Sequence, residues 1–156
     1  MRPVSEVRPF GRRAALSLLL LAVPGLAGAA PKGRPSVTLD RLVLPEGVER
    51  AHELARHLKQ VLRREARRAD WGAGSRAKIE YRFIVEELDV RVDGGVLRVR
   101  CKALGRLPKG KSARSRLEYG GSPAKRLQEI KKVLEIVARG VITRLADLER
   151  QRRLGR

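Results

Sequence analysis

The stretch KIEYRFIVEELDVRVDGGVLRVRCKALGRLPKGKSARSRLEY, residues 78–119, decides the fold of this chain. Apolar and polar residues alternate along it, which is typical of strands that bury one face. The alternation slips by one residue at Glu86-Glu87, which indicates a β-bulge. Asp93-Gly94-Gly95 has the composition of a hairpin turn, and Gly105–Lys111 is predicted to form a second turn. The stretch therefore predicts three antiparallel strands with one apolar face and one charged face.

A strand and two helices are predicted around this meander. Residues 36–44 form a short strand that ends before Pro45. Residues 46–68 repeat apolar side chains at three- and four-residue spacing, with acidic residues early and arginines late, as the helix dipole favours. A second helix begins at Ser122-Pro123, with serine as the N-cap, and runs to about Arg150. The order β-α-β-β-β-α predicts an α+β fold, a two-layer sandwich with two helices on one face of an antiparallel sheet.

Composition sets further limits on this fold. A chain of 156 residues accommodates one ordinary domain, and two Phe, two Tyr and one Trp leave Val, Leu, Ile and Ala to build its core. A single cysteine, Cys101, excludes an internal disulfide framework and a zinc site built from cysteines. Cys101 falls in the apolar register of its strand, so we expect a buried thiol. An intermolecular disulfide is the alternative.

The first 29 residues have the order of regions of a secretory signal peptide. Arginines precede the apolar run Leu16–Leu26, and Ala27-Gly28-Ala29 supplies the small residues at which a signal peptidase cleaves. The run is shorter than the roughly 20 apolar residues of a membrane-spanning helix. An uncleaved signal anchor is the alternative, and Arg12-Arg13 leaves Sec and twin-arginine export both open. We expect a cleaved signal at 1–29, a flexible lead at 30–35, one domain at 36–150 and a basic C-terminal tail at 151–156, in a periplasmic or secreted protein.

The charge balance is strongly basic, with 36 Lys and Arg against 17 Asp and Glu and a formal net charge of +19. Residues 1–29 carry four arginines and one glutamate, so they contribute only +3 to this net charge. Between Gly94 and Leu117 the chain carries eight basic residues and no acidic one. By strand alternation most of them leave the outer, charged face of the sheet, which suits an anionic partner. The predicted binding residues are Arg98, Arg100, Lys102, Arg106, Lys109, Lys111, Arg114 and Arg116. The alternative is a solvated face balanced by Glu80, Glu86 and Glu118.

No pattern of catalytic residues stands out. His52 and His57 are five residues apart on one predicted helix and diverge by about 140°, which does not suit shared metal binding. The chain has neither a glycine-rich phosphate loop nor a nucleophile elbow. We therefore expect no enzymatic activity, no cofactor and no metal. The expected function is that of an exported binding or scaffold protein with an anionic partner: lipid or lipopolysaccharide phosphates, an acidic polysaccharide or an acidic protein.

Two resemblances concern the order of elements alone. From Glu46 to Leu148 the α-β-β-β-α order resembles double-stranded RNA-binding domains, and Lys125-Arg126 and Lys131-Lys132 stand where those domains place phosphate-binding residues. That resemblance implies a nucleic-acid-binding module as the alternative function. Residues 36–150 also resemble small exported envelope proteins, the LptE-like lipopolysaccharide-assembly proteins and the TolB amino-terminal type of domain. No cysteine follows the expected cleavage point, in contrast to the lipoproteins among them.

Overall fold

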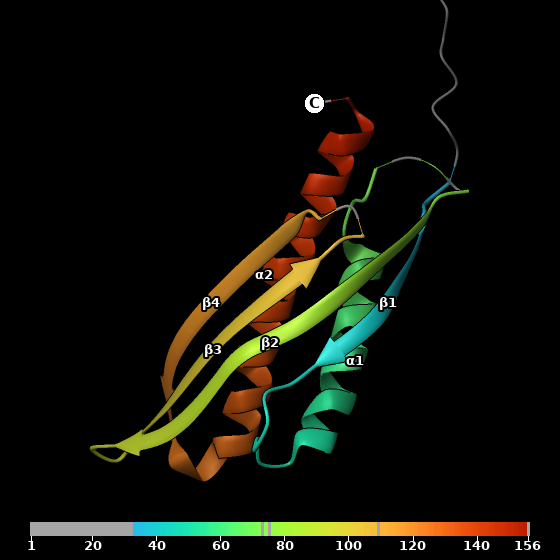
Figure 1. The fold of residues 1–156 in the computed structure, drawn as a ribbon. Helices are drawn as coiled ribbons and strands as arrows, with labels where there is room; N and C mark the ends of the chain where they lie inside the picture. The colour runs from blue at the N-terminus through green and yellow to red at the C-terminus, as the bar shows by residue number, and fades with distance from the viewer. Residues whose placement is uncertain (1–32, 73, 75, 109, 156) are drawn as a thin grey trace, which may run out of the picture.

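The computed structural model describes residues 33–155 except Ala73, Ser75 and Lys109. The expected signal peptide at 1–29 and the first residues of the expected lead lie outside the described residues, as does Arg156. The elements follow the predicted order, and the α+β class is confirmed (Figure 1). They are β1 (Ser36–Val43), α1 (Ala51–Arg68), β2 (Lys78–Asp93), β3 (Val96–Arg106), β4 (Ser112–Gly121), a 3₁₀ turn (Pro123–Lys125) and α2 (Arg126–Arg153).

The four strands form one open sheet in the order β1-β2-β3-β4. The pairs β2–β3 and β3–β4 are antiparallel, as predicted. The prediction of a wholly antiparallel sheet is corrected at β1, which runs parallel to β2 with Ser36 opposite Lys78. The physical reason is the connection: α1 crosses over between these two neighbouring strands and returns the chain in the same direction.

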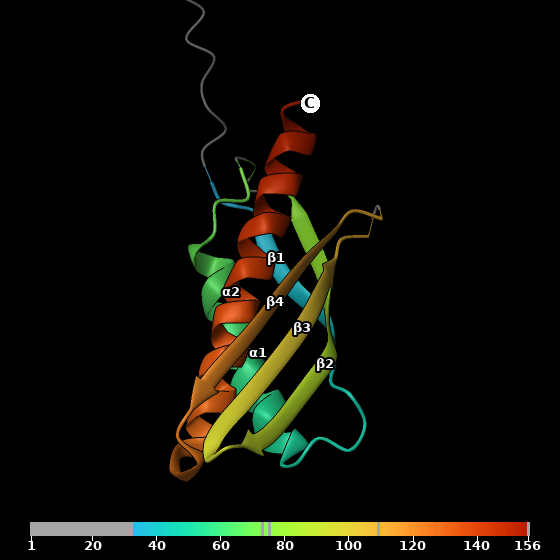
Figure 2. The ribbon, with the colours of Figure 1, turned by 90° about the vertical axis from the view of Figure 1, so that its left-hand side faces the viewer.

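Both helices lie on one face of the sheet, which gives the predicted two layers (Figure 2). The core fills the space between the layers. Its largest fully buried side chains on the sheet are Tyr81 and Phe83 of β2, and the helices contribute Leu58, Leu62 and Leu134. Aliphatic side chains make up most of the remaining core, as the composition predicts.

Two local predictions about the strands are confirmed. The pairing of β2 with β3 shifts between Val85 and Glu87, so the slip in the alternation is a β-bulge. Gly94 and Gly95 join β2 to β3 with φ values of 56° and 77°. Both values are positive, which a two-residue hairpin turn of type I′ requires and which glycine adopts without steric cost.

Gly105 was predicted to begin the second turn, and this prediction is wrong. Gly105 is a buried residue of β3, opposite Phe83 on one side and Ala113 on the other. The turn itself lies later, where the Leu107 amide donates to the Lys111 carbonyl at 2.8 Å. A Cβ atom at Gly105 would lie 2.5 Å from a methyl group of Val141. The glycine therefore marks the place where α2 lies closest to β3.

The helix boundaries differ from the predicted ones for local reasons. α1 begins at Ala51 and not at Glu46, because Gly47 and Arg50 have φ values of 74° and 56°, which no right-handed helix contains. α2 continues to Arg153, three residues beyond the predicted end. The buried carboxylate of Glu149 accepts hydrogen bonds from the Arg152 and Arg153 side chains, at distances from 2.6 to 2.9 Å, and this holds the last turn.

Candidate anion-binding surface

The predicted basic residues of β3 and β4 do share the outer face of the sheet. Buried and exposed positions alternate along β3, and Lys102 lies directly opposite Arg116 across the β3–β4 pair. Arg106 is exposed at the end of β3, and Lys111 is partly buried in the turn that follows. Lys109 lies outside the described residues. The alternation thus places Arg98, Arg100, Lys102, Arg106, Arg114 and Arg116 on one face.

Carboxylates neutralise much of this outer face. Arg100 lies 3.2 Å from Glu118 and 3.8 Å from Glu87, and the Lys102 ammonium lies 3.4 Å from Glu87. Further pairs join Arg98 to Asp93 at 3.4 Å and Arg114 to Glu86 at 3.9 Å. Most of these acidic side chains belong to β2, which precedes the acid-free residues 94–117 in the sequence. Within the described part of the chain, only Arg106, Lys111 and Arg116 of the predicted set form no ion pair.

A second set of basic side chains lies on the outer surface of α1. Arg56, Lys59, Arg63 and Arg67 follow one another at spacings of three, four and four residues, so they lie on one stripe of the helix. All four are exposed, and no ion pair joins any of them to a carboxylate in residues 33–155 as described. We call these four residues the α1 stripe. The spacing of these four residues is visible in the sequence, but the absence of ion pairs with the described carboxylates is not.

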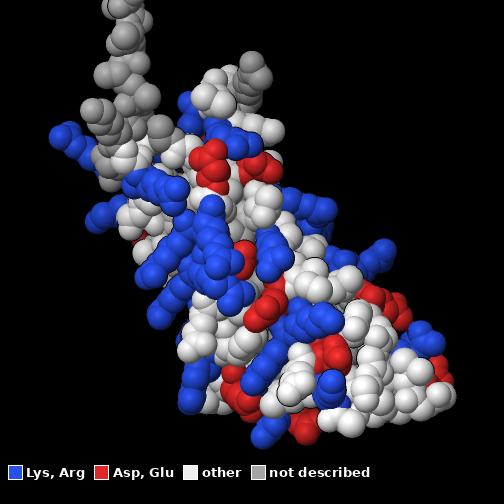
Figure 3. Space-filling view, turned by 180° about the vertical axis from the view of Figure 1, so that it is seen from behind, with Lys and Arg blue, Asp and Glu red and all other residues white. Residues whose placement is uncertain are grey.

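The opposite flank of α1, which faces α2, has its charges paired. The Lys131 ammonium donates to Glu53 at 2.7 Å, and this hydrogen bond lowers the pKa of the Glu53 carboxyl. Glu65 is buried and accepts from Arg64 at 3.1 Å, and Arg139 of α2 lies 3.5 Å from it. Figure 3 views the helical face: acidic side chains lie among the basic ones between the helices, whereas basic side chains gather over α1 at the left.

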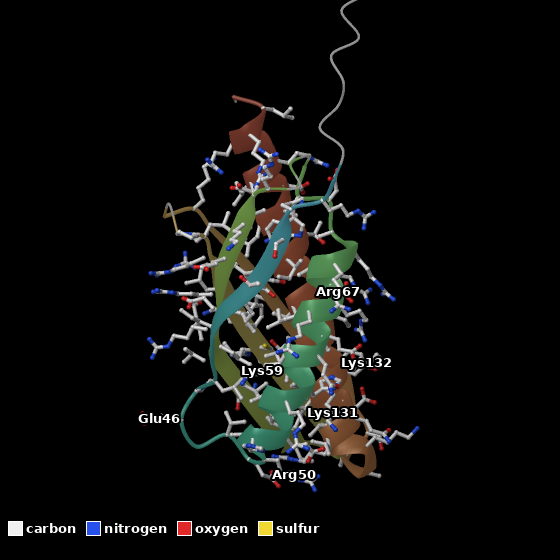
Figure 4. The ribbon with its side chains drawn as sticks, turned by 90° about the vertical axis from the view of Figure 1, so that its right-hand side faces the viewer. Glu46, Arg50, Lys59, Arg67, Lys131 and Lys132 are labelled. Atoms are coloured by element: carbon white, nitrogen blue, oxygen red, sulfur yellow. The ribbon has the colours of Figure 1, made fainter. Side chains whose placement is uncertain are left out.

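The α1 stripe borders a groove of about 520 Å³ between α1 and β1. Figure 4 views this side of the molecule, with Lys59 and Arg67 on α1 beside β1. The floor includes Tyr81, whose hydroxyl donates to the Leu62 carbonyl at 3.4 Å and whose pKa is raised by burial. Asp40 is the one carboxylate among the described residues that line the groove, and Arg82 binds it at 2.8 Å. The cations along the groove therefore have no acidic neighbour that competes for them.

Other kinds of site find little support in the described residues. No three His, Cys, Asp or Glu side chains of residues 33–155 as described are grouped to hold a metal ion. His52 is exposed, and His57 is partly buried with its Nε2 atom 3.3 Å from Glu135. Neither α1 nor α2, the helices of the described chain, is long and apolar enough to cross a membrane.

Cys101 is fully buried in β3, as its register predicts, and burial raises the pKa of its thiol to about 12. At pH 8 about one Cys101 side chain in ten thousand is then a thiolate in the folded protein. A cysteine in an unfolded chain has a pKa of about 8.5, so a far larger fraction of it is thiolate at this pH. We expect a disulfide reagent such as Ellman's reagent to react with Cys101 only when the chain unfolds, so that the rate follows urea concentration. Rapid reaction of the folded protein would contradict the buried position.

The comparisons with known proteins give distant structural likenesses. No protein-family model and no curated protein matches the sequence. Among solved structures, the chain is similar to a candidate lipoprotein from Caulobacter crescentus, with 16% identity, a TM-score of 0.44, and coverage of 75% of this chain and 90% of that one. It is also similar to a dodecameric PelC protein from Paraburkholderia phytofirmans, with 12% identity, a TM-score of 0.41, and coverage of 72% and 90%.

A third likeness is to a minor lipoprotein from Acinetobacter baumannii, with 15% identity, a TM-score of 0.34, and coverage of 74% of this chain and 91% of that one. All three are bacterial proteins. Identities and TM-scores this low do not assign a family or a function, so the functional argument depends on the residues themselves.

Proposed function

We propose that this chain is an exported, non-enzymatic binding protein that holds an anionic partner on the α1 stripe. One observation carries the proposal: Arg56, Lys59, Arg63 and Arg67 form an exposed row with no ion pair to a carboxylate of the described chain, whereas many cations elsewhere are paired. Of the four, Arg56 adds to the effect of Lys131 in lowering the pKa of the Glu53 carboxyl, so the proposal depends on Lys59, Arg63 and Arg67. Unpaired guanidinium and ammonium groups bind carboxylates, phosphates or sulfates without first giving up an internal ion pair. The signal-like sequence of residues 1–29 supports the exported location.

The outer face of the sheet is the weaker candidate for the same function. Its predicted residues Arg98, Arg100, Lys102 and Arg114 would have to exchange a carboxylate neighbour for a ligand. That exchange brings little net gain, because the anion merely replaces another anion. Arg106, Lys111 and Arg116 remain available there, and they provide a matched comparison.

The nucleic-acid alternative is less favoured, because three of the four basic residues that support it, Arg126, Lys131 and Lys132, have partners within the described chain. Arg126 lies 3.5 Å from Glu49, and Lys131 lies 2.7 Å from Glu53. Lys132 donates to the Tyr119 hydroxyl at 3.3 Å and lies over the Tyr119 ring. A phosphate backbone would have to displace the two carboxylates to engage this cluster.

Charge reversal tests the proposal. We expect the triple variant Lys59→Glu, Arg63→Glu and Arg67→Glu to bind heparin about one to two orders of magnitude more weakly at about 0.15 M salt, since each exposed ion pair contributes up to about 1 kcal/mol. Heparin-column elution and fluorescence anisotropy measure the change, and far-UV circular dichroism checks that the helices persist.

The matched control is the triple variant Arg106→Glu, Lys111→Glu and Arg116→Glu, which changes net charge by the same amount on the other face of the molecule. We expect it to weaken heparin binding by only a few fold, through the shared loss of net charge. Equal losses in the two variants would mean that net charge alone drives binding. A larger loss in the control would assign the site to the outer face of the sheet.

A further inference from the structure

The groove beside the α1 stripe is bordered by a strand with a free edge. β1 is the first strand of the sheet, and no strand of the described chain lies on its other side. The Ser36 amide donates to the Ala77 carbonyl at 2.9 Å, so Ser36 directs its backbone groups toward the β2 side. Because successive residues of a strand direct these groups to opposite sides, the N–H and C=O of Val37 and Leu39 face the open edge.

The opposite edge of the sheet, β4, is obstructed by α2. The Arg144 guanidinium of α2 donates to the Arg114 backbone carbonyl, which occupies one acceptor of that strand. α2 also lies close to β4 at Gly140, where a Cβ atom would lie 2.9 Å from the Ser115 hydroxyl. β1 therefore has the more accessible edge. An unpaired strand edge accepts another extended chain through its backbone groups.

The spacing of the groove's cations matches an added strand. Lys59, Arg63 and Arg67 are four residues apart, so they repeat about every 6 Å along α1. Side chains on one face of an extended chain repeat about every 6.6 Å. Acidic residues at alternate positions of a strand lying in the groove would thus meet successive cations of α1.

We infer that the groove between β1 and α1 binds an extended acidic polypeptide segment, which adds to the free edge of β1 and directs alternate carboxylates toward Lys59, Arg63 and Arg67. The inference rests on the proposed function and names the class of partner. A lipid headgroup or a polysaccharide supplies anions, but only a polypeptide also supplies backbone donors and acceptors at the spacing of a strand. The shift in β1 pairing between Leu39 and Arg41 ends the regular edge, so the segment needs only about four to six residues.

The direct test uses a capped synthetic peptide in which Glu and Val alternate over six residues, added to the purified full chain. We expect binding that slows amide hydrogen exchange at Val37 and Leu39. The same peptide with N-methyl groups on the amides of one side keeps its charge but loses the donors of that edge. Of the two N-methylated forms, we expect the one that blocks the β1-facing side to bind at least about tenfold more weakly.

A protein variant gives a second and independent test. Val37→Pro removes one donor from the open edge without removing a bond to β2, and it leaves every charge in place. We expect this variant to bind the alternating peptide several-fold more weakly while its heparin retention stays at the wild-type value. The peptide with three consecutive Glu followed by three Val serves as the control of equal charge.

The possible results separate the two proposals. Equal binding of both N-methylated peptides, or no protection of Val37 and Leu39, would overturn strand addition while heparin binding still supports the anionic surface. If neither heparin nor the peptide binds at the α1 stripe of the wild-type chain, the proposed function itself is overturned. RNA or anionic vesicles are also added as competitors of the peptide. If the chain then no longer prefers the peptide, the groove belongs to that other class of ligand, and the inference is contradicted.

Discussion

Replacing Gly105 by alanine lowers the free energy of unfolding by about 2 kcal/mol, because the added methyl group meets side chains that have no room to move away. Its Cβ would lie 2.5 Å from Val141 and 2.6 Å from Leu145, both fully buried on α2. Such contacts force α2 away from β3 or push side chains out of their preferred rotamers. Urea unfolding followed by circular dichroism measures the loss.

Gly120→Ala is the matched control, since Gly120 is also a glycine within a strand. The nearest atom to its added Cβ is a methyl group of Val96 at 3.4 Å, which is ordinary contact. We expect no loss at this position, and a small gain is consistent with the lower backbone entropy of alanine in the unfolded chain. A neutral Gly105→Ala variant would contradict the close approach of α2 to the sheet.

Replacing Phe83 by alanine has the largest expected effect on stability. Phe83 is fully buried in β2 and lies opposite Gly105, so its ring occupies the space beside the place where α2 approaches. Loss of a buried Phe side chain costs about 3–5 kcal/mol, through lost transfer energy and the cavity left behind. That is a large part of the roughly 5–15 kcal/mol that stabilises a domain. We expect the urea midpoint to fall accordingly.

The neighbouring substitution Ile84→Ala gives the control for Phe83. Ile84 points to the outer face and is only partly buried, so its truncation leaves little cavity. We expect it to lower the free energy of unfolding by less than half as much as Phe83→Ala. Similar losses at the two positions would mean that the core does not lie on the helical face of the sheet.

Features that depend on neighbouring residues along the chain were predictable from sequence. The bulge after Val85 and the hairpin turn at Gly94-Gly95 both follow from short patterns, and the structure confirms both. Gly105 was not predictable in the same way, because a glycine in a turn and a glycine under a helix look identical in the sequence. What distinguishes them is Val141 on α2, 36 residues away.

The parallel pairing of β1 does have a signal in the order of elements. A strand, a helix and a second strand that pairs with the first form a crossover, and a crossover joins parallel strands. What the sequence does not state is that β1 and β2 are neighbours in the sheet. That adjacency depends on how α1 packs and is settled only when the fold forms.

The outer face of the sheet shows why counting charges along a stretch predicts a binding surface poorly. The acid-free residues 94–117 form β3 and most of β4, but Glu86, Glu87 and Asp93 reach them from β2. For the α1 stripe the sequence and the structure contribute differently. Its spacing is plain in the sequence, yet only the structure shows that no carboxylate of the described chain pairs with it.

The most direct test of the α1 stripe as the anionic surface is an NMR titration of the isotope-labelled chain with heparin. We expect the backbone amide signals of residues 56–67 in α1, together with those of β1, to shift progressively, while the signals of Arg98, Arg100 and Lys102 stay in place. Shifts concentrated on residues 98–116 with α1 unchanged would contradict the account and assign the anionic partner to the outer face of the sheet.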